Sequence, residues 1–123
     1  MKLTWHSNLK IQMTFDRWKV DHEYSEAMYN YLVYGFNPGS FFTSVLANDF
    51  VGAMARSHPA NTISALKRLA GWMRDYLPPM ACGSYGAVNA WVDLDASQRR
   101  QILEEYSLIY TEKEETWRVL NNA

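Results

Sequence analysis

The single cysteine of the chain, Cys82, is a candidate nucleophile. It precedes a Gly-Ser pair where the pattern predicts the start of a helix, and a helix N-terminus lowers the pKa of a thiol and favours the reactive thiolate. A cysteine nucleophile also needs an imidazole base close in space. The three histidines fall in different predicted elements, with no spacing that pairs one of them with the thiol: His6, His22 and His58. The sequence therefore favours a small, buried structural cysteine.

Asn48 and Asp49 interrupt an otherwise apolar helix face, and Asp49 is a candidate catalytic carboxylate. Acid–base catalysis would need a second carboxylate or a histidine beside it. The order of the chain does not place one there. The pattern favours a structural role, in which Asp49 caps a helical segment over residues 50–56 and satisfies its first backbone N–H groups.

The spacings that metal and phosphate sites require are missing. The sequence has no His-x-x-x-His, no second cysteine and no acidic loop of the calcium-binding type. The stretch Gly83-Ser84-Tyr85-Gly86 lacks the lysine and the preceding strand of a phosphate-binding loop. We expect a protein that uses no cofactor and no metal and that is not an enzyme.

Composition narrows the class of protein further. The 123 residues are 48% hydrophobic, which predicts one folded domain over residues 1–123. The net charge of −1 makes nucleic-acid binding an unfavourable hypothesis, because no excess of positive charge is available to neutralise phosphates.

The cellular location is predicted from the cysteine count and from the absence of long apolar runs. A single cysteine fits a reducing compartment. No apolar run approaches the roughly 18 residues of a membrane span, and the N-terminus lacks the apolar core of a signal peptide. The expected location is the cytoplasm.

The elements that must position these residues begin with a predicted β-hairpin over residues 1–20. Apolar and polar residues alternate from Leu9 to Phe15, which is typical of a strand with one buried face. His6-Ser7-Asn8 would be the turn of the hairpin. The open edge of such a strand could pair with a second copy of the chain, so a homodimer through this edge is one expected partner.

Residues 21–121 have a helical pattern, so we predict a mainly α fold: a compact bundle of about five helices with the short hairpin, or alternatively an α+β fold. Gly35 is expected to end the first helix of the bundle. The clearest helix would start with Pro59 in its first turn. Its expected core positions are Ile63, Leu66, Leu69, Ala70, Met73 and Leu77. The expected helix caps are Asp21, Ser40, Asp49, Ser84 and Asp95, with capping boxes at Asp95–Gln98 and Thr111–Glu114.

Aromatic residues are abundant, with five Trp, eight Tyr and five Phe. Those outside the periodic core faces are candidate anchors for a protein partner: Trp5, Trp18, Tyr29, Tyr85 and Trp117. Basic residues of the clearest helix are candidate partner contacts as well: Lys67, Arg68 and Arg74. They would join Arg99 and Arg100 in one positive patch if their two helices pack side by side, and otherwise form an ordinary solvated helix face.

The stretch from residue 34 to residue 91 resembles a family of small proteins encoded by tailed bacteriophages. The resemblance depends on three short patterns and three single residues at consistent order and spacing: Phe36-x-Pro38-x-Ser40-Phe41, Val45-Leu46-x-Asn48-Asp49-Phe50, Asn61, Pro79, Cys82-Gly83-Ser84 and Trp91. Here His58 stands where the family pattern has Asp, and the Trp between Cys and Gly is absent. The resemblance implies a phage origin rather than an activity.

These observations give one leading hypothesis and two alternatives. The leading one is a phage-encoded accessory protein that binds a host protein and inhibits or redirects it, in the manner of an anti-CRISPR inhibitor of host defence. A small enzyme that uses Cys82 or Asp49 is the first alternative. The second is a structural or assembly protein of the virion.

Overall fold

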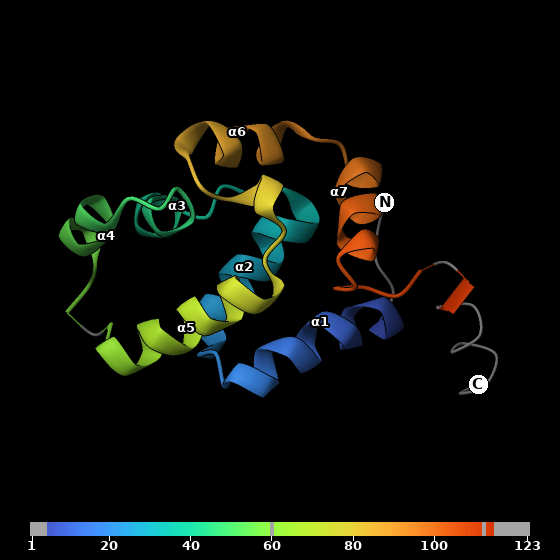
Figure 1. Cartoon of the computed structure of the whole chain (residues 1–123), viewed down its shortest axis with the longest axis horizontal. Coiled ribbons are helices and arrows are strands. Elements are labelled where there is room, and N and C mark those ends of the chain that lie inside the picture. Colours follow the sequence, from blue (N-terminus) through green and yellow to red (C-terminus); the bar gives the residue numbers. More distant parts are fainter. Residues whose placement is uncertain (1–4, 60, 112, 115–123) are drawn as a thin grey trace.

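The computed structural model describes residues 5–59, 61–111 and 113–114, with only the backbone for residues 5–8. This part of the chain contains no β-strand. Its elements are, in order, α1 (Trp5–Trp18), α2 (His22–Tyr34), α3 (Ser40–Leu46), α4 (Phe50–Arg56), α5 (Ile63–Tyr76), the 3₁₀ turn η1 (Pro79–Ala81), α6 (Tyr85–Asp93) and α7 (Ala96–Glu105) (Figure 1). The mainly α prediction is confirmed, with seven α-helices in the described residues instead of about five.

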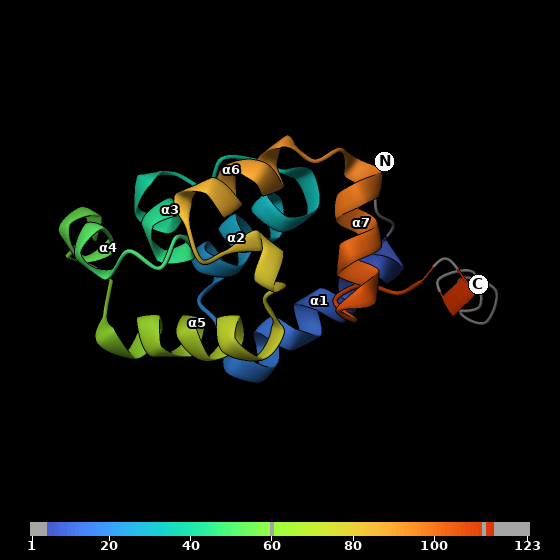
Figure 2. The same ribbon diagram turned by 45° about the horizontal axis from the view of Figure 1, so that its top comes forward.

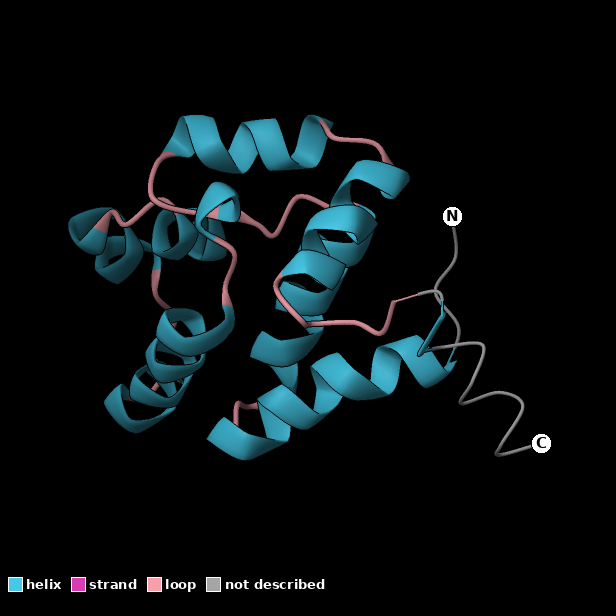
Figure 3. Cartoon of the chain, turned by 45° about the vertical axis from the view of Figure 1, so that its right-hand side comes forward, coloured by secondary structure: helices cyan, strands magenta, loops and turns pink. Residues whose placement is uncertain are grey.

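The predicted N-terminal hairpin is wrong where the structure describes residues 1–20, because Trp5–Trp18 is the helix α1 (Figure 3). Ile11, Thr14 and Phe15 are buried, which is the spacing of a helix face. Met13, which a strand would bury with Ile11, is 57% exposed. Thr14 donates a hydrogen bond to the Ile11 carbonyl (2.6 Å) and accepts one from the Trp72 indole (2.9 Å). The proposed dimer through a strand edge therefore loses its basis.

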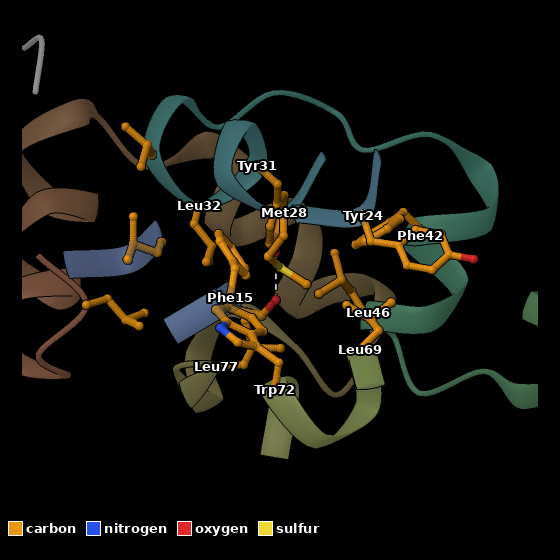
Figure 4. Packing of buried hydrophobic residues seen from close by; sticks show 14 of the residues in the cluster. Phe15, Tyr24, Met28, Tyr31, Leu32, Phe42, Leu46, Leu69, Trp72 and Leu77 are labelled. Atoms are coloured by element: carbon orange, nitrogen blue, oxygen red, sulfur yellow. Dashed lines mark hydrogen bonds between the residues drawn. The ribbon is translucent and has the colours of Figure 1, made fainter. Parts of the chain in front are cut away.

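The core lies where α1, α2 and α5 meet α3, α6 and α7 (Figure 4). The Trp72 ring stacks on Phe15 with 4.7 Å between centroids, and Tyr31 and Trp91 form a second aromatic pair. Each polar tip has a partner: the Tyr31 hydroxyl donates to the Ala81 carbonyl (2.6 Å) and the Trp91 indole donates to the Tyr31 carbonyl (3.1 Å). Large aromatic residues can therefore fill the core without burying unpaired donors.

Three of the expected caps are formed. The side chains of Asp49, Ser84 and Asp95 accept hydrogen bonds from the backbone at the starts of α4, α6 and α7, and Asp95 completes its capping box with Gln98. The box between Thr111 and Glu114 is formed too.

Two expected caps and one helix start are corrected. The Asp21 side chain makes no cap hydrogen bond and instead pairs with Arg68 (3.0 Å). Ser40 is the first residue of α3, and Gly39 occupies the N-cap at φ 88° without a side-chain cap. Pro59 precedes α5, which Thr62 caps by accepting from the Ala65 N–H (3.1 Å).

The end of α2 agrees with the prediction for Gly35, which adopts φ 67°. Its N–H donates to the Tyr31 carbonyl, and the Phe36 N–H donates back to Asn30, as in a Schellman ending. The buried Arg99 lies against this turn and donates to the carbonyls of Val33 and Leu94. One guanidinium from α7 therefore joins the C-terminal ends of α2 and α6.

Candidate functional site: an apolar groove lined by α3, α4 and α5

Helix α5 has two apolar faces, and only one of them is fully buried in the core. Ala65, Leu69 and Trp72 are buried against the other helices. A second row of apolar residues lies about a third of a turn around the helix from the buried row. Its members follow one another at intervals of three, four and three residues: Ile63, Leu66, Ala70 and Met73. Ile63 and Ala70 are exposed, so two of the six positions expected in the core lie at the surface.

Helix α4 also directs apolar side chains away from the core. Ala53 is its one buried residue, whereas Phe50 and Val51 are each 76% exposed and Met54 is 48% exposed. The helix packs chiefly on α3. It lies at the edge of the molecule, and α5 runs beneath α3 and α4 (Figure 2).

These helices enclose an open groove of about 560 Å³, within the range of roughly 300–1,000 Å³ that is common for binding pockets. Its lining is mostly hydrophobic and comes from three elements. Helix α3 contributes Phe41, Ser44 and Val45; the turn and α4 contribute Asn48, Asp49, Phe50, Ala53 and Met54; and α5 contributes Ile63, Leu66, Lys67, Leu69, Ala70 and Met73.

A polar cluster lies where α3, α4 and α6 meet beside the groove. The Tyr85 hydroxyl donates to Asp49 Oδ2 (2.5 Å) and lies 3.2 Å from the Ser44 Oγ. Arg56 Nη1 donates to the same serine (3.0 Å), and the Gly52 N–H donates to Asp49 Oδ1 (2.9 Å). The hydrogen bond from Tyr85, followed by that from Gly52, lowers the pKa of Asp49. Its carboxylate is therefore held ionised by structural partners, an arrangement opposite to that of a general acid.

The positive charge that lines the groove belongs to Lys67, whose side chain is exposed and makes no ion pair with the described residues. Its basic neighbours on α5 are paired: Arg68 with Asp21 (3.0 Å) and Arg74 with Asp75 (3.1 Å). The three residues predicted as one set of partner contacts thus have different surroundings.

The larger positive patch that was one reading of the sequence does not form. Arg99 is buried, so its charge is not presented at the surface. Arg100 pairs with Glu104 (3.0 Å) along α7 and is only 10% exposed at its side chain. Sequence spacing predicted a surface position for both, but α7 packs on α2 and Arg99 lies against the end of that helix.

Of the five predicted aromatic anchors, the structure describes the side chains of three. Trp18 donates its indole N–H to Asp75 (3.1 Å), and Arg74 lies 5.7 Å above its ring, so it connects α1 to α5. Tyr29 packs edge-on against Tyr34, and burial raises its pKa. Tyr85 is exposed beside the groove and its hydroxyl is held by Asp49. The Trp5 side chain and Trp117 lie outside the described residues.

Cys82 is half-buried in the turn before α6, and its thiol lies 3.8 Å from the carbonyls of Pro78 and Pro79. Burial raises its pKa, so the local environment disfavours the thiolate that nucleophilic attack needs. His22 lies beside Glu26 on the exposed side of α2. Among the described residues no three acidic, histidine or cysteine side chains are grouped as a metal site would require.

The sequence contains a signal for this groove that helical spacing alone does not separate from the core face. The apolar residues of α5 extend over more of its circumference than one core-facing stripe needs, and the short segment 50–54 holds three large apolar residues. Both features indicate a second apolar surface.

None of the helices in the described part of the chain is both long enough and apolar enough to cross a membrane. Comparison of the chain with known protein families, with curated proteins and with solved structures found no match.

Proposed function

We propose that this protein is a non-enzymatic binding protein that docks a partner protein in the groove between α3, α4 and α5. The observation that carries the proposal is where exposed hydrophobic residues gather. Nine large hydrophobic side chains are exposed in the described part of the chain, and four of them lie on α4 and at the start of α5: Phe50, Val51, Met54 and Ile63. Such a concentration is typical of an interaction site.

The energetic reason is the cost of leaving these side chains in water. Full burial of one large apolar side chain such as Phe50 is worth about 1.5–3 kcal/mol. In the free protein Phe50 and Ile63 are 76% and 73% exposed, so most of that free energy is available to a partner that covers them. A central apolar anchor region bordered by polar residues, here Asp49 and Lys67, is the usual organisation of a protein interface.

The resemblance of residues 34–91 to small tailed-phage proteins supports a bacterial host protein as the partner. In this proposal the protein covers a functional surface of a host-defence component and blocks it sterically, as anti-CRISPR proteins do. No covalent step is needed, which agrees with the raised pKa of the Cys82 thiol and the fully engaged carboxylate of Asp49.

The test uses two matched phenylalanines. Phe50 lines the groove and is 76% exposed, whereas Phe36 is 58% exposed in the turn after α2 and does not line it. A photoreactive residue is placed at Met54 in the tagged protein, which is expressed in bacterial host cells with Phe50→Glu, Phe36→Glu or neither change. We expect one dominant cross-linked host protein that Phe50→Glu removes and Phe36→Glu leaves in place. Equal cross-linking in all three, or none in any, would refute the proposal.

A further inference from the structure

The chemistry of the partner segment follows from the hydrogen-bonding capacity of the groove. The surface is lined mostly by hydrocarbon side chains, and the described part of the chain offers no strand edge to which an extended peptide could add. A partner backbone covered here must therefore satisfy its own N–H and C=O groups. A helix does this internally, whereas an extended segment would bury unpaired groups.

The dimensions of the groove fit a short helix. The lining residues of α5 run from Ile63 to Met73, which spans about 15 Å at a rise of about 1.5 Å per residue, or about three turns. Ile63, Leu66, Ala70 and Met73 form a ridge with the three- and four-residue spacing on which helices interdigitate. The facing wall is formed by α3 and α4, so a helix in the groove would contact all three elements.

The charged residues that line the groove indicate which charge the docked segment carries. Asp49 is already held by the Tyr85 hydroxyl and the Gly52 N–H. Lys67 has no ion-pair partner among the described residues, and covering the groove would place its ammonium group against the docked segment and take it partly out of water. A buried charge without a partner is costly, so the docked segment must bring a carboxylate to this position.

We infer that the groove binds one amphipathic helix of a partner protein, about three turns long, with its apolar side chains on the Ile63–Met73 ridge and an Asp or Glu against Lys67. This inference rests on the proposed function, since it specifies what occupies the same site.

Two photoreactive positions at the ends of the groove provide a ruler for the conformation of the partner. One version of the protein carries the photoreactive residue at position 63 and another carries it at position 73, and the cross-linked partner residues are identified by mass spectrometry. If the partner segment is helical, the two cross-links fall about ten residues apart in its sequence, because about 15 Å corresponds to ten helical residues. An extended segment would place them about four or five residues apart.

A charge reversal tests the carboxylate. We expect Lys67→Glu to reduce the cross-linking yield about tenfold, because it places like charges against each other. Lys67→Arg should keep most of the yield. Lys113→Glu makes the same change of charge at an exposed residue that does not line the groove, and should have no effect.

The outcomes separate this inference from the proposed function. Cross-links to a host protein at the extended spacing, or a yield that Lys67→Glu leaves unchanged, would overturn the inference while the groove remained a docking site. Cross-links to a second copy of this chain would overturn the assignment to a partner protein. If neither position 63 nor position 73 gave a cross-link, the proposed function itself would be overturned.

Discussion

Replacing Arg99 by methionine should cost more stability than replacing any exposed basic residue of this protein. Arg99 is 7% exposed and donates to the carbonyl of Val33, at the end of α2, over 3.2 Å, and to the carbonyl of Leu94 after α6. Both acceptors lie at helix C-terminal ends, where the helix dipole favours a cation. Methionine fills most of the volume but leaves the two carbonyls without this donor.

The magnitude follows from those two acceptors. An unsatisfied buried polar group costs about 1–3 kcal/mol. The hydrogen bond to Val33 is buried and that to Leu94 is only partly buried, so water can replace the second in part. Burying the charged guanidinium of Arg99 itself costs free energy, and methionine does not have this cost. The difference offsets part of the destabilisation caused by the lost hydrogen bonds. We expect a net destabilisation of about 2–4 kcal/mol, a large share of the 5–15 kcal/mol typical of a folded domain.

Equilibrium unfolding in urea, followed by far-ultraviolet circular dichroism, measures this change. Lys67→Met is the control, because Lys67 is exposed and makes no ion pair with the described residues, so its replacement should change the free energy of unfolding by less than about 0.5 kcal/mol. The slope against urea should be the same for the three proteins, which would show that the variants unfold from comparably compact states. An Arg99→Met protein within about 0.5 kcal/mol of the unaltered chain, a value typical of surface substitutions, would refute the argument.

Three further predictions concern local packing and protonation. A Cβ added at Gly71 would overlap the Trp18 ring, so Gly71→Ala should destabilise the fold by about 1–3 kcal/mol in urea unfolding, the reverse of the usual gain from Gly→Ala in a helix. The raised pKa of Cys82 should make its thiol react more slowly with a disulfide reagent in the folded protein than in urea, with the difference narrowing as the pH rises above 9.0. Because the pKa of Asp49 is lowered from 3.8, its stabilising contribution is complete at neutral pH and is lost as the pH falls through the lowered value. The destabilisation caused by Asp49→Asn, measured by thermal unfolding, should therefore be present at pH 7 and vanish in strong acid, and a pH-independent difference would contradict this.

Features that depend on a few neighbouring residues could be predicted from the sequence. The caps by Asp49, Ser84 and Asp95 are formed, and so is the left-handed ending at Gly35. Each involves groups within about six residues of one another, so local geometry decides it. The cap predicted at Asp21 is not formed, because its carboxylate pairs with Arg68, which is distant in the sequence.

The N-terminal segment could not be assigned from its pattern. The apolar and polar residues of Leu9–Phe15 alternate as in a strand. The side that is buried is nevertheless the one that contacts Trp72, whose indole donates a hydrogen bond to Thr14 across 58 residues of sequence. A polar residue that sequence reasoning would place in water thereby becomes part of the core. The long-range contact, which no short window contains, decided between two local structures of similar propensity.

The sequence alone determined that the chain is mainly helical and where several of its helices are capped, but it assigned both apolar faces of α5 to the core. Only the tertiary structure decided which side is covered. Ile63 and Leu69 are equally apolar, yet Ile63 is 73% exposed and Leu69 is 1% exposed. The physical reason is that helical periodicity fixes the direction of a side chain around its own axis, whereas burial depends on whether another element occupies that direction. Beside Ile63 the chain leaves a groove.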